Sequence, residues 1–190
     1  MEKVPRRIFL DTSVINFIVD HTELIFDGYY YDDNLTDRVM KDIFALHQIF
    51  QLAQRCPIEI AVSRTSFEEI LQTNNGSKRS HLLSYCMEIL HYFESLTRQE
   101  FGIPEMELKL IENFLMEKDF LRITDQNDRR LLLESLYYEC DFFCTRDWRT
   151  ILKHRKFITQ IPIKIVTPWE WWEKIEDSIR TPTSRPAVNS

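Results

Sequence analysis

The chain has 190 residues, of which 44% are hydrophobic, and a formal net charge of −6. This length favours one domain with a well-buried core. The acidic balance argues against a basic coat that binds nucleic acid passively, and the low glycine and proline content argues against a fibrous or disordered polymer. The four cysteines show no zinc-type spacing, and the start "MEKVPRRIF" has no signal-peptide core. We therefore expect a cytoplasmic protein with reduced thiols and no membrane contact.

In chain order, the sequence predicts strands that alternate with helices. Strands are predicted at residues 8–10, 58–62, 120–123, 141–145 and 163–166. Helices are predicted at residues 36–55, 63–73, 81–93, 104–115 and 127–139, and from residue 168 onward. Residues 21–35 lose all periodicity and are predicted to form a loop that carries three consecutive tyrosines.

This alternation is typical of an α/β fold in which a mostly parallel central sheet is sandwiched by helices, in three α/β/α layers. We expect one domain over residues 1–178, with additional loop and helical segments at 21–35 and 76–117. The polar tail 179–190 contains two prolines and is expected to be disordered. Ligands of such folds bind outside the carboxyl ends of the strands, so functional side chains should lie there.

Four acidic residues fall at predicted junctions of this kind. They are Asp11 at the end of the first strand, Glu69 in the first turn of the helix after the second strand, Asp128 at the start of the helix that follows "FLRI", and Asp147 just beyond "DFFCT". If the sheet is parallel, all four project into one crevice at its carboxyl edge.

The mutual repulsion of these carboxylates predicts a metal site. Two unit charges about 5 Å apart repel by roughly 3 kcal/mol at an effective dielectric near 20, and several such pairs strain the stability of a small domain. The cluster must therefore hold protons or cations. Hard oxygen ligands suit Mg²⁺ or Mn²⁺, and such an ion can activate water and stabilise a phosphodiester transition state.

Two of the acids also have a purely structural interpretation as helix caps. Asp11 could cap a helix that begins near Ser13. Glu69 could form a capping box with Ser66, although Thr65 and Glu68 form an equivalent box that would leave Glu69 available.

The other two acids have structural alternatives as well. Asp128 competes with Asp125 for the cap of its helix, and Asp125 is the better placed of the two. Asp147 could simply pair with Arg146 or Arg149. Each alternative is plausible singly, but four caps and surface pairs at four strand ends are a less economical explanation than one site.

Four blocks of the sequence resemble those of a known family. In order, "IFLDTSVINF", "VSRTSFEEI", "NDRRLLLESLYYECDFFCTRDW" and "IKIVTPWEWW" resemble the characteristic blocks of PIN-domain ribonucleases, which include the VapC-type toxins of bacterial toxin–antitoxin pairs. The most specific pieces are "LDTSV" and "CTRD". The resemblance spans residues 7 to about 175, with the identities in short islands. It implies a PIN-like fold and a Mg²⁺- or Mn²⁺-dependent endoribonuclease that uses metal-activated water.

Carried over residue by residue, the resemblance also implies site residues. The metal-binding and catalytic acids would be Asp11, Glu69, Asp128 and Asp147. Thr145 matches the family's hydroxyl residue beside the last acid, and Ser63 matches the small polar residue that closes the second strand. Glu69, rather than Glu68, lies at the family's spacing from Ser63.

A basic run after the last acid is the predicted RNA contact. Its candidates for phosphate binding are Arg146, Arg149, Lys153 and Lys156, with His154 and Arg155 between them. A solvated charged face explains the run about equally well. Arg129 and Arg130 could extend the same rim.

Two groups of aromatic residues have a candidate role in binding or in packing. Tyr29, Tyr30 and Tyr31 could stack on unpaired bases, although surface packing or a protein contact is the commoner role of tyrosines in a loop. The tryptophans of the last helix (Trp169, Trp171 and Trp172) are interpreted as core and interface packing.

Two other function classes compete with a nuclease. A non-catalytic PIN-like module would bind RNA or protein and keep its acids without turnover, but the presence of all four acids favours the enzyme. An aspartyl-phosphate phosphatase requires a second acid two residues after the first, and this position is Ser13. The resemblance implies RNA as substrate and adds an antitoxin protein and a second copy of the chain as candidate partners.

Overall fold

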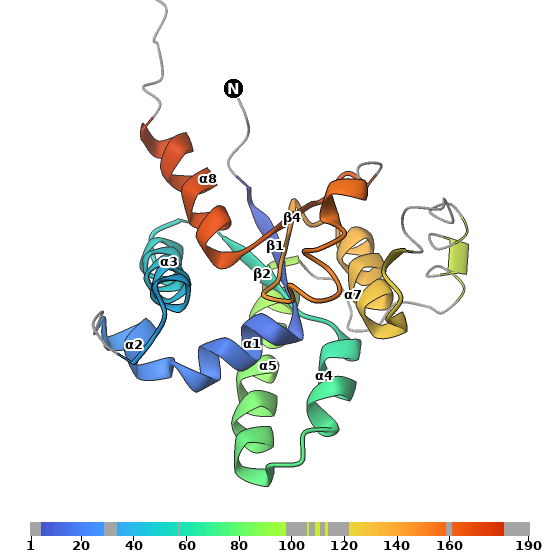
Figure 1. Ribbon diagram of the computed structural model, residues 1–190, viewed down its shortest axis with the longest axis horizontal. Helices are drawn as coiled ribbons and strands as arrows, with labels where there is room; N and C mark the ends of the chain where they lie inside the picture. Colours follow the sequence, from blue (N-terminus) through green and yellow to red (C-terminus); the bar gives the residue numbers. More distant parts are fainter. Residues whose placement is uncertain are drawn as a thin grey trace, which may run out of the picture.

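The computed structural model describes residues 5–28, 34–56, 58–97, 106, 109, 110, 113, 122–158 and 161–180. The sheet contains the strands β1 (Arg7–Leu10), β2 (Glu59–Ala61), β3 (Phe142–Cys144) and β4 (Lys164–Val166). The helices around it are α1 (Thr12–Asp20), α2 (Thr22–Asp27), α3 (Asp37–Ala53), α4 (Arg64–Leu71), α5 (Gly76–Thr97), α7 (Gln126–Tyr137) and α8 (Pro168–Arg180), with a short 3-10 helix η2 (Arg155–Phe157) before β4 (Figure 1).

The four strands form one sheet in the order β2-β1-β3-β4, and every pair in it is parallel. Phe9 of β1 lies opposite Ala61 of β2 and Phe143 of β3, and Phe143 lies opposite Ile165 of β4. The predicted α/β class with a parallel central sheet is therefore confirmed.

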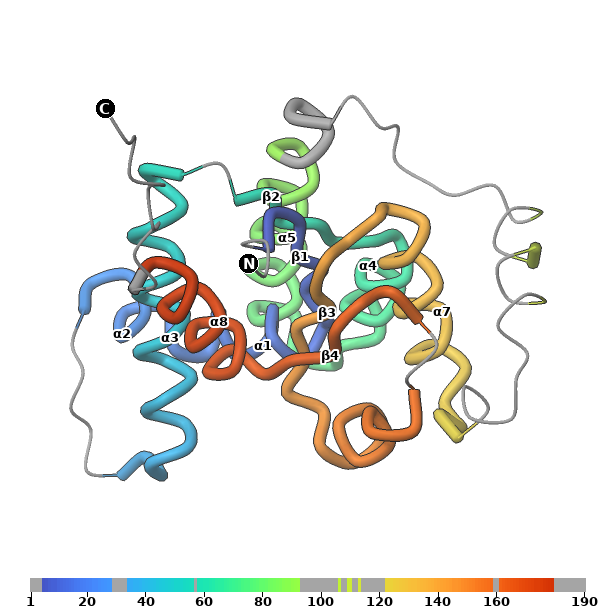
Figure 2. Tube along the Cα trace, turned by 90° about the horizontal axis from the view of Figure 1, so that it is seen from above, coloured from blue at the N-terminus to red at the C-terminus, as the bar shows by residue number. Residues whose placement is uncertain are grey.

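Side chains that alternate along the strands divide the core into two layers. On one face, Ile8 and Leu10 pack in a cluster with apolar residues of α1, α3, α5 and α8, including the fully buried Trp171. On the other face, Phe9 and Phe143 stack at 5.5 Å and pack against the leucines of α7. Figure 2 shows α3 and α8 on one side of the strands and α7 on the other. The central residues of the strands are apolar because helices cover both faces of the sheet there, whereas Arg7, Glu59 and Lys164 stand at the amino ends of β1, β2 and β4.

The prediction of a loop over residues 21–35 is wrong for its first part, because residues 22–27 form α2. Ile25 of this short helix is fully buried, and the ring of Phe26 stacks on Phe50 of α3 at 5.2 Å. His47 of α3 also bonds the Ile25 carbonyl through Nδ1 at 2.7 Å. Packing against α3 thus stabilises a helix that is too short to show a periodic pattern. The three tyrosines of this segment lie outside the described residues.

The predicted strand at 120–123 is also wrong in the part that is described. Arg122 lies in a 3-10 turn, and Ile123 is buried against α7 without joining the sheet. Arg129 donates to the Ile123 carbonyl at 2.8 Å, so a side chain satisfies a backbone group that a strand would have paired. The predicted helix at 104–115 and the tail beyond Arg180 lie largely or wholly outside the described residues.

Local caps set the first residues of α5 and α4. Asn75 accepts a hydrogen bond from the Lys78 amide at 3.0 Å, and α5 begins at Gly76 rather than at residue 81. Ser63 accepts from the Ser66 amide at 3.4 Å, and α4 begins at Arg64. Both predicted capping boxes of α4 are therefore wrong, and Glu69 lies in the second turn of this helix rather than in the first. Of the helices that the structure describes, none combines the length and the apolar character needed to cross a bilayer.

Candidate functional site

The order of the strands creates a crevice between the carboxyl ends of β1 and β3. These strands are neighbours, but the chain leads from β1 to β2 on one side and from β3 to β4 on the other. Parallel sheets bind ligands at such a switch point. Asp11 directly follows β1 and Asp147 follows β3 by three residues, and the Asp11 amide donates to the Cys144 carbonyl at 3.0 Å. The sheet thus brings two of the predicted acids to one place.

Asp11 lies deepest in this crevice, with 4% of its surface exposed. Its Oδ2 accepts hydrogen bonds from the hydroxyls of Ser13 and Thr145, the latter at 2.6 Å. Burial raises the pKa of the Asp11 carboxyl, the two hydroxyls oppose that rise, and the charge of Asp147 adds to it. Asp11 occupies the N-cap position of α1, but its side chain makes no capping hydrogen bond. The side chain is therefore not the helix cap that one alternative predicted.

Asp147 is held by the turn that follows it. Its Oδ1 accepts from the amides of Arg149 at 2.7 Å and Thr150 at 2.9 Å, and its Oδ2 accepts from the Thr150 hydroxyl at 2.5 Å. Burial acts to raise the pKa of Asp147, but the hydrogen bonds from Thr150 and Arg149 outweigh it and the pKa is lowered. The Asp147 amide in turn donates to Thr145 Oγ1 at 2.9 Å. Asp147 is thus ionised and fixed toward Asp11 through the shared Thr145 hydroxyl.

Glu69 and Asp128 approach the same crevice from α4 and α7. The pKa of Glu69 is raised to about 7, first by burial and then by the charges of Asp11 and Asp128, against a partial offset from Thr12. The pKa of Asp128 is likewise raised to about 6, first by burial and then by charges that include Asp11, while the Thr150 hydroxyl opposes the rise. The structure therefore brings all four acids within electrostatic reach of one another. We call these four residues the acid cluster.

Within the described residues, hydroxyl groups rather than ion-pairing side chains lie around Asp11, Glu69 and Asp128, whereas the Arg149 charge acts on Asp147. Within the described ranges, no ion pair reaches Asp11, Glu69 or Asp128. Thr12 Oγ1 is buried beside Glu69 and has no partner of hydrogen-bond geometry. The same part of the chain contains no group of three or more His, Cys, Asp or Glu residues arranged so that it could hold a metal ion. The acids share one electrostatic environment, but their side chains are not arranged as ligands.

The two supporting residues have different roles. Thr145 is fully buried and joins Asp11 to Asp147, as described above. Ser63 is equally buried, but the bond that it makes is the cap of α4. Asp125, rather than Asp128, caps α7 by accepting from the amides of Asn127 at 2.8 Å and Asp128 at 3.2 Å, as predicted. The Asp128 side chain is consequently left to face the crevice.

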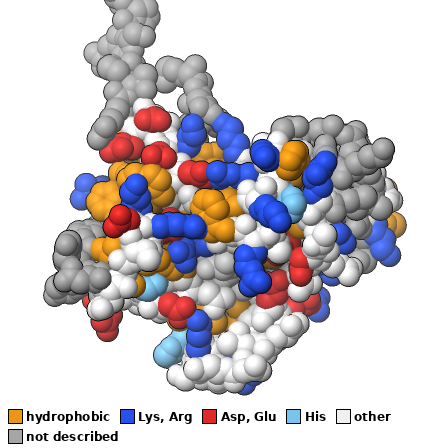
Figure 3. Space-filling view, in the orientation of Figure 1, with side chains coloured by type: hydrophobic (Ala, Val, Ile, Leu, Met, Phe, Trp, Pro, Cys, Tyr) orange, Lys and Arg blue, Asp and Glu red, His pale blue; other side chains and the backbone are white. Residues whose placement is uncertain are grey.

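In the folded protein, some residues of the predicted basic run are paired within the chain and others are exposed. Arg146 Nε lies 2.8 Å from Asp42 Oδ2, with its guanidinium 3.5 Å above the Phe17 ring, and so it faces inward. Arg155 pairs with Glu170, which it contacts at 2.6 Å through Nη2. The remaining members of the run that were predicted to contact phosphate, Arg149, Lys153 and Lys156, are exposed. Lys and Arg side chains spread across the middle of the face seen in Figure 3.

The two arginines at the start of α7 that were predicted to extend the basic rim also make contacts within the chain. Arg129 donates to the Ile123 carbonyl, and Arg130 Nε lies 3.3 Å from Glu134 Oε1.

Three residues of the site were missed from the sequence. Ser13 and Thr150 bond acids two and three residues away, and a hydroxyl at this spacing from an aspartate is a local signal that could have been used. Asp42 gives no such signal, because its partner Arg146 is 104 residues away.

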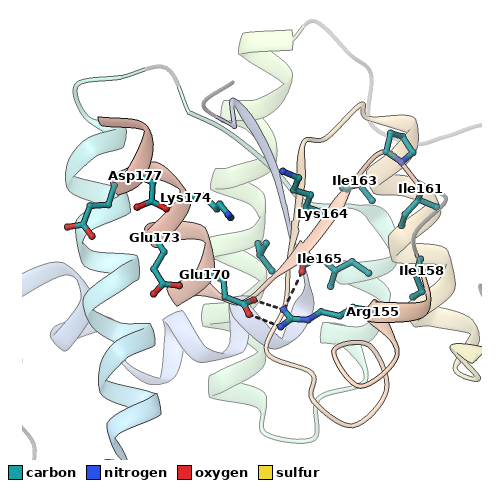
Figure 4. Close-up of a pocket in the computed structure, with 13 residues that line it drawn as sticks. Arg155, Ile158, Ile161, Ile163, Lys164, Ile165, Glu170, Glu173, Lys174 and Asp177 are labelled. Carbon is teal, nitrogen blue, oxygen red and sulfur yellow. Dashed lines mark hydrogen bonds and ion pairs between the residues drawn. The ribbon is translucent and has the colours of Figure 1, made fainter. Parts of the chain in front are cut away.

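A hollow of about 860 Å³ lies apart from the acid cluster, between β4, α8 and residues 158 and 161–163 (Figure 4). The Arg155–Glu170 ion pair closes one end of it, and the side chains of Ile158, Ile161 and Ile163 line the opposite wall. None of the four acids lines this hollow, so it is not part of the candidate active site.

Comparisons of the chain with protein-family models, with curated proteins and with solved structures found no match.

Proposed function

We propose that the chain is a PIN-type endoribonuclease that depends on a divalent cation, Mg²⁺ or Mn²⁺. The observation that carries the proposal is the acid cluster at the switch point of a parallel sheet, in which three of four carboxylates have no cationic partner within the described residues. The resemblance of the sequence to PIN-domain toxins supplies the reaction class and RNA as the substrate.

The donor atoms of the site suit a hard cation. Carboxylate oxygens from Asp11, Glu69, Asp128 and Asp147 would hold the ion, and oxygen ligands are what Mg²⁺ and Mn²⁺ prefer. The elevated pKa of Glu69, about 7, reflects burial and uncompensated neighbouring charge, which a cation would relieve. Because the carboxylates are not arranged as ligands in the structure, binding has to bring at least three of them together.

The chain's own residues prepare the site in three ways. The hydroxyls of Ser13 and Thr145 fix the Asp11 carboxylate, and the turn at Thr150 fixes Asp147. Burial of Asp11 keeps bulk water away from the base of the crevice, which strengthens electrostatic interactions there. When bound, the cation would supply an activated water molecule and balance the charge of the phosphodiester.

The test is cleavage of a labelled single-stranded RNA of mixed sequence, with Mn²⁺, with Mg²⁺ and with a chelator. We expect cleavage by the wild-type protein in either metal and none in the chelator. Asp11→Asn should reduce the cleavage rate by more than about 100-fold. Loss of a residue that only supports a metal ligand costs up to about 100-fold, and loss of a ligand should cost more.

Asp20→Asn is the matched control, because Asp20 lies on the same helix α1 but is half exposed and pairs with Lys78 at 2.7 Å. It should cleave at the wild-type rate. Metal-independent cleavage, or an Asp11→Asn variant as active as Asp20→Asn, would contradict the proposed function.

A further inference from the structure

A second pocket, of about 330 Å³, adjoins the acid cluster. Its walls come from the first turns of α3, the start of α8 and the segment after β3. The residues that line it include Arg38, Lys41, Asp42, Trp148, Trp169 and Glu170. We call it the tryptophan pocket. Its volume lies at the lower end of the range of ligand pockets and so suits one ring system better than a long ligand.

Buried Asp42 connects the tryptophan pocket to the acid cluster. Its Oδ2 accepts from Arg146 Nε at 2.8 Å, and its Oδ1 accepts from the Trp169 amide at 3.3 Å. The Arg146 amide donates at 3.0 Å to Ser13 Oγ, which itself donates to Asp11. In addition, Trp148 is the next residue in the chain after Asp147. Hydrogen bonds through Asp42, Arg146 and Ser13 therefore link the pocket to Asp11.

Aromatic rings and cations alternate in this pocket. The Arg38 guanidinium lies 3.6 Å from the centre of the Trp148 ring, and Lys41 Nζ lies 5.4 Å from the centre of the Trp169 ring. Trp148 nevertheless keeps 44% of its surface exposed, and exposed Phe44 continues the aromatic surface 6.3 Å from Trp169. Tryptophan rings and guanidinium planes are the surfaces on which proteins stack unpaired bases.

The charges of the pocket favour an anionic ligand. Asp42 and Glu170 line it, but Arg146 and Arg155 neutralise them from behind. Among the described residues that line the pocket, Asp37 is the one remaining carboxylate near Arg38 and Lys41. In a chain with a net charge of −6, this local excess of cations next to exposed rings matches a ligand that combines an aromatic base with a phosphate.

We propose that the tryptophan pocket binds an unpaired base of single-stranded RNA beside the acid cluster, with the base stacked at Trp148 and the flanking phosphates at Arg38 and Lys41. The proposal rests on the proposed function for the nature of the ligand and narrows the substrate to single-stranded RNA. It assigns Trp148 a role in binding, whereas the alternative is that the ring–cation pairs only join α3 and α8 to the segment after β3.

The test measures binding in a chelator, where no cleavage is expected. The probes are a fluorescent single-stranded oligoadenylate, the same strand in a duplex, and an abasic strand of equal length. We expect the single strand to bind more tightly than both other probes. Trp148→Ala should weaken its binding by roughly 5- to 100-fold, the usual effect of losing one stacked base, while Trp148→Phe should retain most of the affinity.

Phe157→Ala is the matched control, because Phe157 is an exposed ring with Arg122 at 4.4 Å and Lys156 at 4.9 Å from its centre but lies outside the pocket. It should leave the affinity nearly unchanged. The inference is overturned if wild-type protein fails to bind the single strand, if the duplex or abasic strand binds equally well, or if Trp148→Ala matches Phe157→Ala.

The proposed nuclease activity and the proposed base-binding pocket can each be refuted without the other. Metal-dependent cleavage that requires Asp11 but not Trp148 would leave the nuclease standing and remove the base-binding pocket. Binding that requires Trp148 in a protein that never cleaves RNA would do the reverse.

Discussion

At the amino ends of the strands, buried carboxylates are matched by arginines, whereas at the carboxyl ends they are not. Glu59 of β2 is 5% exposed, and its oxygens lie 2.8 Å from Arg6 Nη2 and 2.7 Å from Arg7 Nε. Asp141 accepts from the amides of the same two arginines at 2.7 and 2.9 Å. At the other edge of the sheet, Asp11 is buried to a similar degree. Within the described residues, however, its hydrogen bonds come from the hydroxyls of Ser13 and Thr145 and from the Thr12 backbone, and no ion pair reaches it.

This difference separates a structural edge of the sheet from a functional one. A buried carboxylate is tolerated when hydrogen bonds and an opposite charge both satisfy it. Hydroxyls satisfy the hydrogen bonds of Asp11 without neutralising it. Protons or a cation from solution must therefore balance the charge at the carboxyl edge. This difference between the two edges of the sheet can be tested by experiment.

The largest expected effect on stability is at the amino edge. Arg7→Met should lower the free energy of unfolding by about 3 kcal/mol, as loss of one partner from a buried ion pair does. Glu59 would keep only Arg6, whose side chain is 64% exposed, and the Tyr138 carbonyl would lose its donor. Urea unfolding measures the change.

The control for this variant is Arg64→Met, which breaks an exposed pair with Glu68 on α4 and should cost less than about 1 kcal/mol. Equal losses in the two variants would mean that the amino edge is no better matched than an ordinary surface.

At the carboxyl edge, removing a charge should stabilise the metal-free protein. In a chelator, we expect Asp11→Asn to raise the free energy of unfolding by about 1 kcal/mol, because it relieves burial of a charge and part of its repulsion with the other acids. Mn²⁺ at 100 times its dissociation constant should add about 2.7 kcal/mol to the wild type and much less to the variant. Thermal unfolding with and without Mn²⁺ should therefore show the two proteins in opposite orders, and an unchanged order would refute a cation site at Asp11.

The acid cluster should also make metal-free stability depend on pH. Glu69 and Asp128 have folded-state pKa values above their ordinary ones, so their protonated forms stabilise the fold below the ordinary pKa, and this stabilisation is lost as the pH rises through the folded-state value. For Glu69 the loss runs from about pH 4.5 to about 7, and for Asp128 from about pH 3.8 to about 6. Each group contributes a slope of at most about 1.4 kcal/mol per pH unit, and partial exposure reduces it.

Denaturation in a chelator between about pH 4 and 7 measures this slope, because this range covers most of the two titrations. Glu69→Gln should flatten the loss of stability, whereas Glu68→Gln, at an exposed position on the same helix, should leave it unchanged. The reverse result would identify Glu68 as the acid that faces the crevice.

The smallest effect on stability is expected from the exposed part of the basic run. Replacing Arg149, Lys153 and Lys156 by alanine should change the free energy of unfolding by less than about 0.5 kcal/mol each. If these residues contact phosphates, the triple variant should bind unrelated RNA sequences more weakly by a similar factor. In a plot of log affinity against log salt concentration, the slope should also become shallower by roughly 0.7 for each lost contact. Identical lines for variant and wild type would show that this part of the run is only a solvated face.

The elements and acids that could be predicted from the sequence share one property, which is that their signal is local. The strand before Asp11 is a short apolar run cut off by polar residues, and the cap at Asp125 follows from the spacing of side chains along a few residues. Helix α2 was missed because its stability depends on burial of Ile25 against α3 rather than on a pattern of its own. Ile123, at the end of the apolar run that was predicted as a strand, packs in the cluster with α7 and does not join the sheet.

The sequence by itself indicated that Asp11, Glu69 and Asp147 lie beyond the carboxyl ends of strands, because the apolar runs before them are local signals. Asp128 follows no strand of the described sheet and reaches the site from α7. Only the tertiary structure decided which charges remain for a ligand. Arg146 and Arg155 appear equivalent to Arg149 in the basic run, but buried Asp42 and half-buried Glu170 pair with the first two. The same pairing leaves Arg38 and Lys41 beside the tryptophans. Which guanidinium pairs with a given carboxylate depends on packing between residues as far as 104 positions apart.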